Sequence, residues 1–545
     1  MTGENEKSKI ASFDVGFGPG ASGRGAAPPE DPSRGAFRIG VVSGLSPRPE
    51  FATSPRDPGG SQAARPVGVD RASFDEIMAE LAPELAIDVT DPHDVRGKPV
   101  RVDLRFAKMR DFRPEILAEQ VHLLRSLRAE RSAAPRVSGG RASEGPAGGK
   151  SLLDSLLDGD DPVPGEASAT PSAGPHLAFT RLLGEVLHHP EVRRLESAWR
   201  GLKWLVDRAG ACEGVSIQVV AARVEDVEPA LDALALGDEP LGLILVDHEL
   251  GATPRDLDRM DRWAQRAEAI GAPLVVNARP ELLGFDDLGA LSRTQRRVRS
   301  SEDPRAAALR NVAARDWARW ISLAANGLVA RPRHTTESAR LGGIPFEEGS
   351  DLFIGAVWAV GALASASFAR CGWPCALTGT SDGRLESLNV RSGDDRGEQV
   401  SLPLEALVRE DVAAEAAGAG VCLLSCAPNR DLAFLLHAPV LFRGPVGASG
   451  TSAAASSTLA EQLFVARVGQ AVLQLAAAIP RDTPPSVALE VARVTLAELF
   501  SGSPGKAPAL DLAISGDPPV LELTVRPRGF LGLRLEEATL AARLA

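Results

Sequence analysis

The sequence predicts an α/β protein, built from two α/β domains that pack together and ending in terminal β-strands. Two observations carry this prediction. Strand-like apolar runs alternate with helical patterns through the middle of the chain, which indicates a largely parallel sheet. In addition, residues 100–106 place apolar side chains on one face and Arg101, Asp103 and Arg105 on the other, as in a strand that covers a core.

Changes in composition divide the 545 residues into folded parts and connecting stretches. The stretches rich in Gly, Pro, Ser and Ala cannot bury enough apolar surface to offset the entropy of ordering the backbone. The predicted divisions are a disordered tail at 1–35, a first domain at 36–131, a linker at 132–175 with a short helix at 151–158, and a second domain at 176–545 with an inner seam at 444–457.

The disordered tail contains one segment with a different pattern. Residues 10–17 alternate loosely between apolar and polar side chains. Such a segment pairs as a strand if another chain offers a sheet edge, and otherwise stays disordered. Both outcomes remain open from the sequence.

The first domain is predicted to contain strands at 37–42 and 100–106 and a helix at 70–81. Pro114 begins a further helix that runs through Arg128, because proline fits the first turn, where the backbone N–H needs no partner.

The second domain shows more elements, including a terminal group of strands that exposes edges unless something pairs with them. The predicted helices cover 177–189, a segment from Pro190 that includes Leu205, 227–236, 257–270, 306–326, 352–370, 459–478 and 486–500. The predicted strands cover 215–220, 241–246, 274–277, 385–390, 509–514, 521–525 and 530–535.

Charge and composition limit the classes of partner. The net charge of −12 disfavours duplex nucleic acid, because neutralising phosphates requires concentrated Lys and Arg. No window approaches the roughly 20 apolar residues that span a bilayer. An odd number of cysteines, five, is typical of reduced thiols. We therefore expect a cytoplasmic protein with no membrane insertion and no nucleic-acid partner.

Motifs for enzymatic chemistry are present only as incomplete strings. The dinucleotide-like string at 18–23 follows no strand, and the phosphate-loop-like string at 144–151 has Glu144 where a glycine is needed. Ser381 lies in a string typical of a nucleophile elbow, but Gly383 indicates a turn into a strand, and nothing places His437 or Asp411 beside it.

Four cysteines form two pairs of equal spacing, a pattern that also occurs in zinc sites. The pairs are Cys371 with Cys375, and Cys422 with Cys426. The second pair lies in an apolar run, where a buried reduced thiol is the commoner explanation. We expect no metal, no cofactor and no catalytic residue.

The first domain contains an ordered set of motifs at 37–44, 66–71, 74–78, 81–85, 102–106 and 111–114. With these motifs, residues 36–131 resemble the small sheath protein of type VI secretion systems. The resemblance covers the first domain.

The second domain resembles the large sheath protein of the same systems. Its strongest motif is residues 195–207, in which Glu196, Trp199, Arg200 and Gly201 form the core of the match. Trp199 suits any apolar helix face, whereas a plain core does not require Glu196 and Arg200. Supporting motifs lie at 185–190, 243–247, 272–273, 280–284, 344–348 and 358–373, while the part after Ser381 matches weakly.

The resemblance implies a structural subunit and not an enzyme. In this family, subunits stack in rings around an inner tube protein on a baseplate, exchange strands with neighbours, and contract to propel the tube. The strands would contain Phe13, Val15, Phe17, Leu521, Leu523 and Val525. An AAA+ unfoldase that recycles contracted sheath would recognise the helix with Leu152, Leu153, Leu156 and Leu157.

Two alternatives remain open from the sequence. One is a sheath-derived adaptor or baseplate-associated protein that keeps the two-part core but does not polymerise. The other is a hydrolase that uses Ser381. The shortened second domain and the tract at 444–457 leave room for the first of these.

Overall fold

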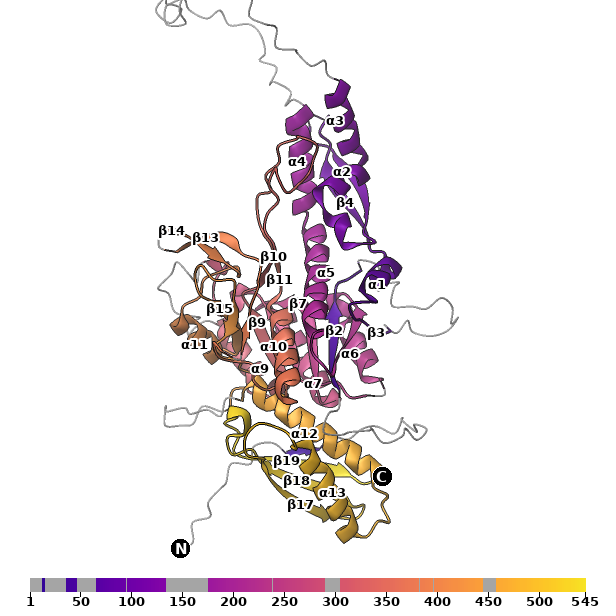
Figure 1. The fold of residues 1–545 in the computed structure, drawn as a ribbon, viewed down its shortest axis with the longest axis vertical. Helices are drawn as coiled ribbons and strands as arrows, with labels where there is room; N and C mark the ends of the chain where they lie inside the picture. Colours follow the sequence, from indigo (N-terminus) through magenta and orange to yellow (C-terminus); the bar gives the residue numbers. More distant parts are fainter. Residues whose placement is uncertain are drawn as a thin grey trace, which may run out of the picture.

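The computed structural model has three tiers, an arm, a central body and a C-terminal unit (Figure 1). It describes residues 12–14, 36–46, 65–94, 96–133, 175–237, 239–289, 304–381, 383–395, 397–444 and 457–545. The predicted helix at 151–158 and the strings at 18–23 and 144–151 lie outside the described residues.

The body is organised around a nine-stranded sheet in the order β12-β16-β15-β9-β8-β7-β2-β6-β3. Its strands from β15 through β6 in this order are parallel, whereas β3, β16 and β12 pair antiparallel. The bounds are β2 (Phe37–Ser43), β3 (Val67–Gly68), β6 (Val215–Ala221), β7 (Leu243–Leu250), β8 (Leu274–Ala278), β9 (Ile321–Ala325), β12 (Arg384–Leu385), β15 (Val421–Cys426) and β16 (Ala433–Leu435).

One inner strand of this sheet comes from the first of the two sequence regions. β2 belongs to the small-sheath-like region, yet it pairs on one side with β6 and on the other with β7, both from the large-sheath-like region. Its residues from Ile39 to Val42 are almost fully buried. The two halves therefore share one sheet and one core, which is a closer union than the two packed domains that the sequence indicated.

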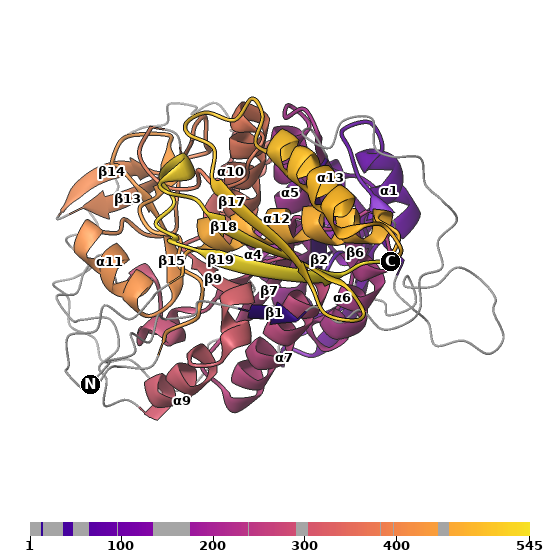
Figure 2. The ribbon, with the colours of Figure 1, turned by 90° about the horizontal axis from the view of Figure 1, so that it is seen from below.

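Helices cover both faces of the sheet. Figure 2 shows α5 and α10 on one side of it and α6, α7 and α9 on the other. Their bounds are α5 (Pro190–Ala209), α6 (Val227–Ala235), α7 (Pro254–Ile270), α9 (Pro304–Ala313) and α10 (Ala356–Cys371). Most of α10 is buried because it packs on the sheet and is itself covered by α5.

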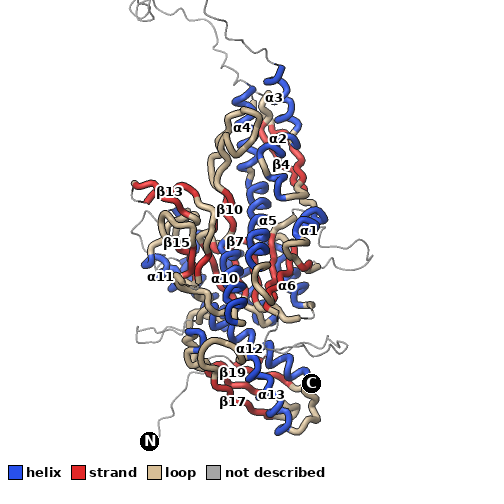
Figure 3. Tube along the Cα trace, in the orientation of Figure 1, coloured by secondary structure: helices blue, strands red, loops and turns tan. Residues whose placement is uncertain are grey.

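The arm joins a hairpin of the first region to a helix of the second. Thr90, at the end of β4, donates hydrogen bonds from its backbone N and its hydroxyl to Glu185 of α4, both at 2.9 Å. The arm consists of β4 (Glu84–Thr90), β5 (Pro99–Arg105), α2 (Pro114–Gln120), α3 (His122–Ala133) and α4 (Pro175–His188), and the short α1 (Phe74–Leu81) lies at its base (Figure 3).

The C-terminal unit is a separate small sheet backed by two helices. Its strands run in the order β1-β19-β18-β17, and α12 lies between this sheet and the body, whereas α13 lies at the far end of the unit (Figures 1 and 2). The bounds are α12 (Leu459–Ala478), α13 (Pro485–Leu499), β1 (Ser12–Asp14), β17 (Ala509–Ser515), β18 (Val520–Arg526) and β19 (Ala538–Arg543).

Smaller elements flank the body. They are β10 (Leu328–Arg331), β11 (Leu352–Ile354), β13 (Arg391–Asp395), β14 (Glu398–Leu402) and α11 (Glu410–Gly418). β10 pairs with β11 and β13 with β14, both antiparallel.

Most predicted elements are confirmed, and five are wrong in part. Of the strand expected at 385–390, only Leu385 lies in a strand, β12. The helix expected from Pro114 through Arg128 is interrupted at Val121 and forms α2 and α3. The helix expected at 306–326 ends at Ala313, and a 3₁₀ turn and then β9 follow it. All five residues of β9 are buried, so its sequence lacks the alternation of apolar and polar residues that identifies a strand. The helix expected at 352–370 begins only at Ala356, after β11. The strand expected at 530–535 is replaced by a 3₁₀ turn, and β19 follows it.

Candidate assembly interface

The C-terminal sheet is the part of the molecule where distant segments of the chain meet. β1, near the N-terminus, pairs in parallel with β19, near the C-terminus, with Phe13 opposite Leu540. β18 lies between β19 and β17, antiparallel to both. One edge of the C-terminal unit thus takes up a strand from far away in sequence.

β18 shows strict alternation between its two faces. Leu521, Leu523 and Val525 are fully buried, whereas Glu522 is exposed. The buried face packs toward α12, which also contacts β19. One apolar face against a helix is the arrangement that makes a small sheet stable.

An aromatic cluster attaches the C-terminal unit to the body. The Trp373 ring, just after α10, stacks on Phe464 of α12 at 5.4 Å and on Phe500 at 5.1 Å between centroids, and meets Phe530 edge-on at 5.4 Å. The indole Nε1 of Trp373 donates a 2.8 Å hydrogen bond to the Ser503 hydroxyl. Aromatic burial of this kind contributes a large share of the packing energy between two elements.

Trp199 of α5 joins the two halves of the chain within the body. Its side chain is fully buried, and its indole Nε1 donates a 3.0 Å hydrogen bond to the carbonyl oxygen of Leu45, just after β2. Its ring also meets Phe74 of α1 edge-on, at 5.7 Å between centroids. The most specific motif of the second region therefore contacts the first region directly.

Gly201 is needed for the contact between α5 and α10. A Cβ atom added at Gly201 would overlap with the indole of Trp358, which is fully buried on α10. Only glycine lets these two helices approach so closely.

Glu196 and Arg200 belong to a buried ionic network. Arg331 of β10 donates to Glu196 from Nε at 2.8 Å and from Nη2 at 3.0 Å, and its Nη1 and Nη2 donate to Glu348 at 2.6 and 3.1 Å. Arg200 Nε donates to Glu196 at 2.7 Å. The network fastens α5 to β10 and to the segment that follows β10.

The network shifts the protonation equilibria of its members. Burial alone would raise the pKa of Glu196, but the hydrogen bonds from Arg331 and Arg200 outweigh burial and lower that pKa. Burial alone would lower the pKa of Arg331, and its bonds to Glu196 and Glu348 raise it instead. Burial and the nearby charge of Arg331 lower the pKa of His334 to about 4. All three groups therefore keep their usual charge state at neutral pH.

The expected assembly residues fall into different environments. Phe13 lies in β1, opposite Leu540 of β19, whereas Val15, Phe17 and the four leucines at 152, 153, 156 and 157 lie outside the described residues. Leu521, Leu523 and Val525 occupy the middle of the sheet, so β18 has no free edge to donate. The long edge strand among the described residues is β17.

The other chemical motifs do not form sites among the described residues. Ser381 lies in a bend before the short strand β12, where a nucleophile elbow requires a helix. Cys375, Cys422 and Cys426 are buried, and burial raises the pKa of the last two to about 12, so these thiols stay protonated. The described residues contain no cluster of three or more potential metal ligands.

The structure is an α/β building block, in which two sequence regions share one sheet and a strand from near the N-terminus is added to a second sheet. The family model "VipB: EvpB/VC_A0108, tail sheath N-terminal domain" matches residues 177–235 and 234–441. The model "Type VI secretion system, VipA, VC_A0107 or Hcp2" matches residues 36–138. The chain belongs to the type VI secretion sheath proteins, with the small-subunit and large-subunit regions fused.

Two individual proteins show similarity to this chain. The type VI secretion system sheath protein TssC1 of Pseudomonas aeruginosa is 26% identical over 318 residues, which cover 52% of this chain and 63% of that protein. The solved sheath tail protein Lin1278 of Listeria innocua is 11% identical, covers 59% of this chain and 60% of its own, and has a TM-score of 0.32, too low to establish a shared fold. Among the described residues, no helix is long and apolar enough to cross a membrane.

Proposed function

We propose that this chain is a subunit of a contractile type VI secretion sheath that polymerises around an inner tube protein in the cytoplasm and contracts to propel the tube. Family membership supports a structural role, without catalysis. The observation that carries the proposal is the addition of β1 to the edge of the C-terminal sheet. A strand that joins a sheet from far along the chain can join the same sheet in a neighbouring copy.

The geometry of the chain is compatible with this exchange. Residues 15–36 connect β1 to β2, and that length spans up to about 70 Å if fully extended. β1 of one copy can therefore reach the β19 edge of another and leave its own sheet open for a third. Backbone hydrogen bonds would then hold neighbours together while the bodies rotate and slide during contraction.

Three further partners follow from the sheath role. We assign the inner tube protein and the baseplate as contacts of the assembled sheath. We assign an AAA+ unfoldase to the segment with Leu152, Leu153, Leu156 and Leu157. If exchanging Leu152 and Leu156 for Ser leaves unfoldase binding unchanged in a pull-down with the purified unfoldase, this assignment is wrong.

Electron microscopy of the purified chain, with and without its tube protein, tests the main proposal. The wild-type chain should form helical tubes. Phe13→Pro should abolish them, because proline removes a backbone donor from β1, whereas Phe13→Val should keep them, because valine favours strands. Tubes of normal length from the proline variant would refute the role of β1.

The second candidate is a sheath-derived adaptor or baseplate-associated protein that does not polymerise. The observation that favours it is that β1 pairs with β19 of its own chain, so that the edge is already occupied. Sedimentation at high concentration separates the two candidates. An adaptor stays monomeric with the tube protein present, whereas a sheath subunit assembles.

A further inference from the structure

A cavity of about 790 Å³ opens at the carboxyl ends of β2, β6, β7 and β8. Following the chain, the sheet grows from β2 to β6 on one side and then from β7 through β8 to β9 on the other. Ligands of open α/β sheets bind at this reversal, outside the carboxyl ends of the strands. The volume lies within the range of small-molecule pockets.

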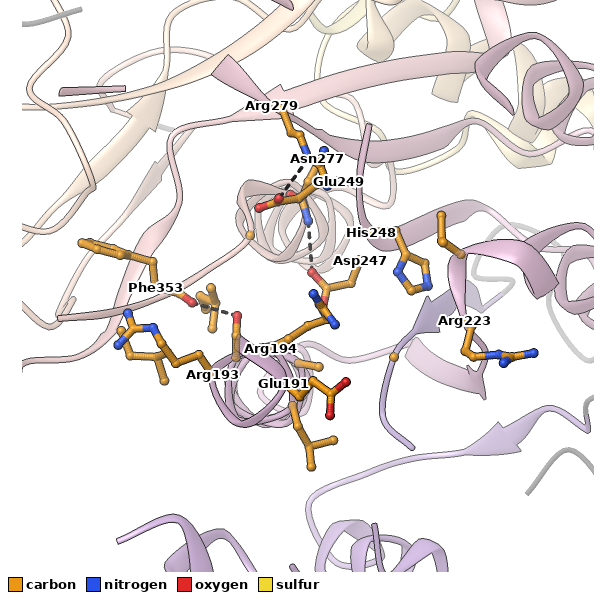
Figure 4. A pocket seen from close by; sticks show the side chains of 18 of the residues that line it. Glu191, Arg193, Arg194, Arg223, Asp247, His248, Glu249, Asn277, Arg279 and Phe353 are labelled. Carbon is orange, nitrogen blue, oxygen red and sulfur yellow. Dashed lines mark hydrogen bonds and ion pairs between the residues drawn. The ribbon is translucent and has the colours of Figure 1, made fainter. Parts of the chain in front are cut away.

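The sheet is irregular where it lines the cavity. The pairing of β7 with β8 shifts between Val246 and Glu249, so Asp247 and His248 stand outside that ladder. Such bulges commonly re-aim side chains beside functional sites. Figure 4 shows Asp247 and His248 within the group of side chains that line this cavity.

The floor of the cavity carries two carboxyl groups. Asp247 accepts hydrogen bonds from the Ser43 hydroxyl at 3.1 Å and from Asn277 Nδ2 at 3.0 Å. Glu405 accepts one from the backbone N of Gly327 at 2.9 Å. Neither carboxyl forms an ion pair with a described residue, whereas Glu249 beside them pairs with Arg279 at 3.4 Å.

Deep burial affects both carboxyl groups. Burial raises the pKa of Asp247 to about 7, against the hydrogen bonds from Ser43 and Asn277. Burial also raises the pKa of Glu405 to about 7, with Glu249 adding to the shift and Arg391 opposing it. Both side chains nevertheless remain partly accessible because they line the cavity. A cationic group placed beside them would restore their ionised state.

Arg193 and Arg194 line the cavity from the first turn of α5, together with Glu191 of the same turn. Arg194 lines the cavity and makes no hydrogen bond or ion pair with a described residue. The Nη1 atom of Arg193 is buried without a hydrogen-bond partner, at 3.8 Å from Glu348. Figure 4 shows Arg194 extending from α5 toward the part of the group where Asp247 lies. The cavity thus contains buried carboxyl groups and a guanidinium that has no ion-pair partner among the described residues.

We propose that this cavity binds a zwitterionic ligand, with an ammonium or guanidinium group on Asp247 and Glu405 and a carboxylate on Arg194. A purely anionic ligand would meet the two carboxyl groups, and a purely cationic ligand would meet Arg194. This site is separate from the C-terminal sheet, so its test does not depend on sheath assembly.

Calorimetry of the full chain with matched probes tests the proposal. The probe 4-guanidinobutyrate carries both groups, agmatine carries an amine in place of the carboxylate, and butyrate lacks the guanidinium. We expect 4-guanidinobutyrate to bind more tightly than either partial probe. Asp247→Asn and Arg194→Ala should each weaken it by roughly ten-fold or more, because each removes a charge-assisted contact.

The release of protons on ligand binding provides a second readout. Because the two carboxyl groups ionise when the cation arrives, binding at neutral pH should release protons, seen as a dependence of the binding heat on the buffer. Arg262→Ala is the control variant, since Arg262 lies on α7, pairs with Glu228 and Asp258 and does not line the cavity. It should bind as the wild type does.

The experiment also separates the two sources of such a ligand. A capped Arg-Gly-Glu peptide represents a segment of another protein, and 4-guanidinobutyrate represents a free small molecule; the tighter probe identifies the source. The proposal is overturned if neither probe binds at millimolar concentration. It is equally overturned if binding persists in Asp247→Asn, or if inorganic phosphate binds more tightly than the zwitterions.

Discussion

The central sheet and the C-terminal sheet differ in the length of the strands at their edges. The central sheet ends in strands of two residues, β3 and β12, which offer little backbone for further pairing. The C-terminal sheet ends in β17, seven residues long, and in β1, which pairs over three residues. The first sheet is closed against addition, whereas the second is open to it.

The two sheets also differ in the contacts that join their strands from distant parts of the chain. In the body, β2 of one region is enclosed by strands of the other, and buried ionic and aromatic contacts of α5 secure the junction. In the C-terminal unit, the pairing that joins the two ends of the chain is short. Under the proposed function, the body is the permanent part of the subunit and the C-terminal sheet is the part that exchanges a strand.

The largest expected effect comes from removing the cation at the centre of the buried network. Arg331→Met removes the central cation and leaves buried Glu196 with only Arg200 at 2.7 Å and buried Glu348 with only the more distant Arg193 at 3.8 Å. This change should lower the free energy of unfolding by about 3–5 kcal/mol. Denaturant unfolding measures this loss. Adding Glu196→Gln and Glu348→Gln to the same variant should restore much of the stability, and an equal loss in the triple variant would contradict the ionic explanation.

Trp373→Ala should lower the free energy of unfolding by a similar amount, about 3–5 kcal/mol. The loss should be confined to the C-terminal unit, because the Trp373 ring joins this unit to the body. Hydrogen exchange should rise in β17, β18 and β19 and stay slow in β2 and β7. Trp263→Ala is the matched control, since Trp263 is equally buried on α7 of the body and its loss should accelerate exchange in the central sheet. Identical exchange patterns would refute the division into two parts.

Gly201→Ala should destabilise the body by about 1–3 kcal/mol, because the new methyl group overlaps with Trp358. Gly184→Ala is the control on α4, where a Cβ atom meets nothing within 4 Å; it should be neutral or stabilising by about 0.4–1 kcal/mol. Thermal unfolding compares the two variants. Equal shifts would mean that the close approach of α5 and α10 is not what requires glycine.

Helices and strands were predicted well from the sequence where the apolar periodicity was clear. They were predicted poorly where pairing with a distant strand determined the secondary structure. The helix at 459–478 agrees with α12 at both ends, because its capping residue Thr458 and Glu461 form a recognisable box. β19 was missed because its Ala-rich sequence favours a helix, and pairing with β18 overrides that preference.

The site was harder to predict than the fold. Glu196 and Arg200 stood out in the sequence as unnecessary for a plain core, but their partner Arg331 is 135 positions from Glu196, and no local pattern links them. The cavity was also unforeseen, since Asp247, Arg194 and Glu405 come from three elements that only the folded sheet brings together. The residues that unite the two regions are thus the least visible from local sequence.

The last expected effect concerns the pH dependence of the body. The pKa values of Asp247 and Glu405, raised by burial to about 7, exceed the unfolded values of 3.8 and 4.5, so the folded chain binds more protons in this interval. Their contribution to stability is therefore present at low pH and is lost as the pH rises to about 7, whereas His334, with its pKa lowered to about 4, has the opposite slope. The double variant Asp247→Asn, Glu405→Gln removes only the first contribution. Its stability relative to the wild type, measured by denaturant unfolding, should increase between about pH 5 and pH 8. A constant difference would show that these carboxyl groups stay ionised in the folded chain, and the body would then tolerate buried charge without the compensation that the ionic network provides.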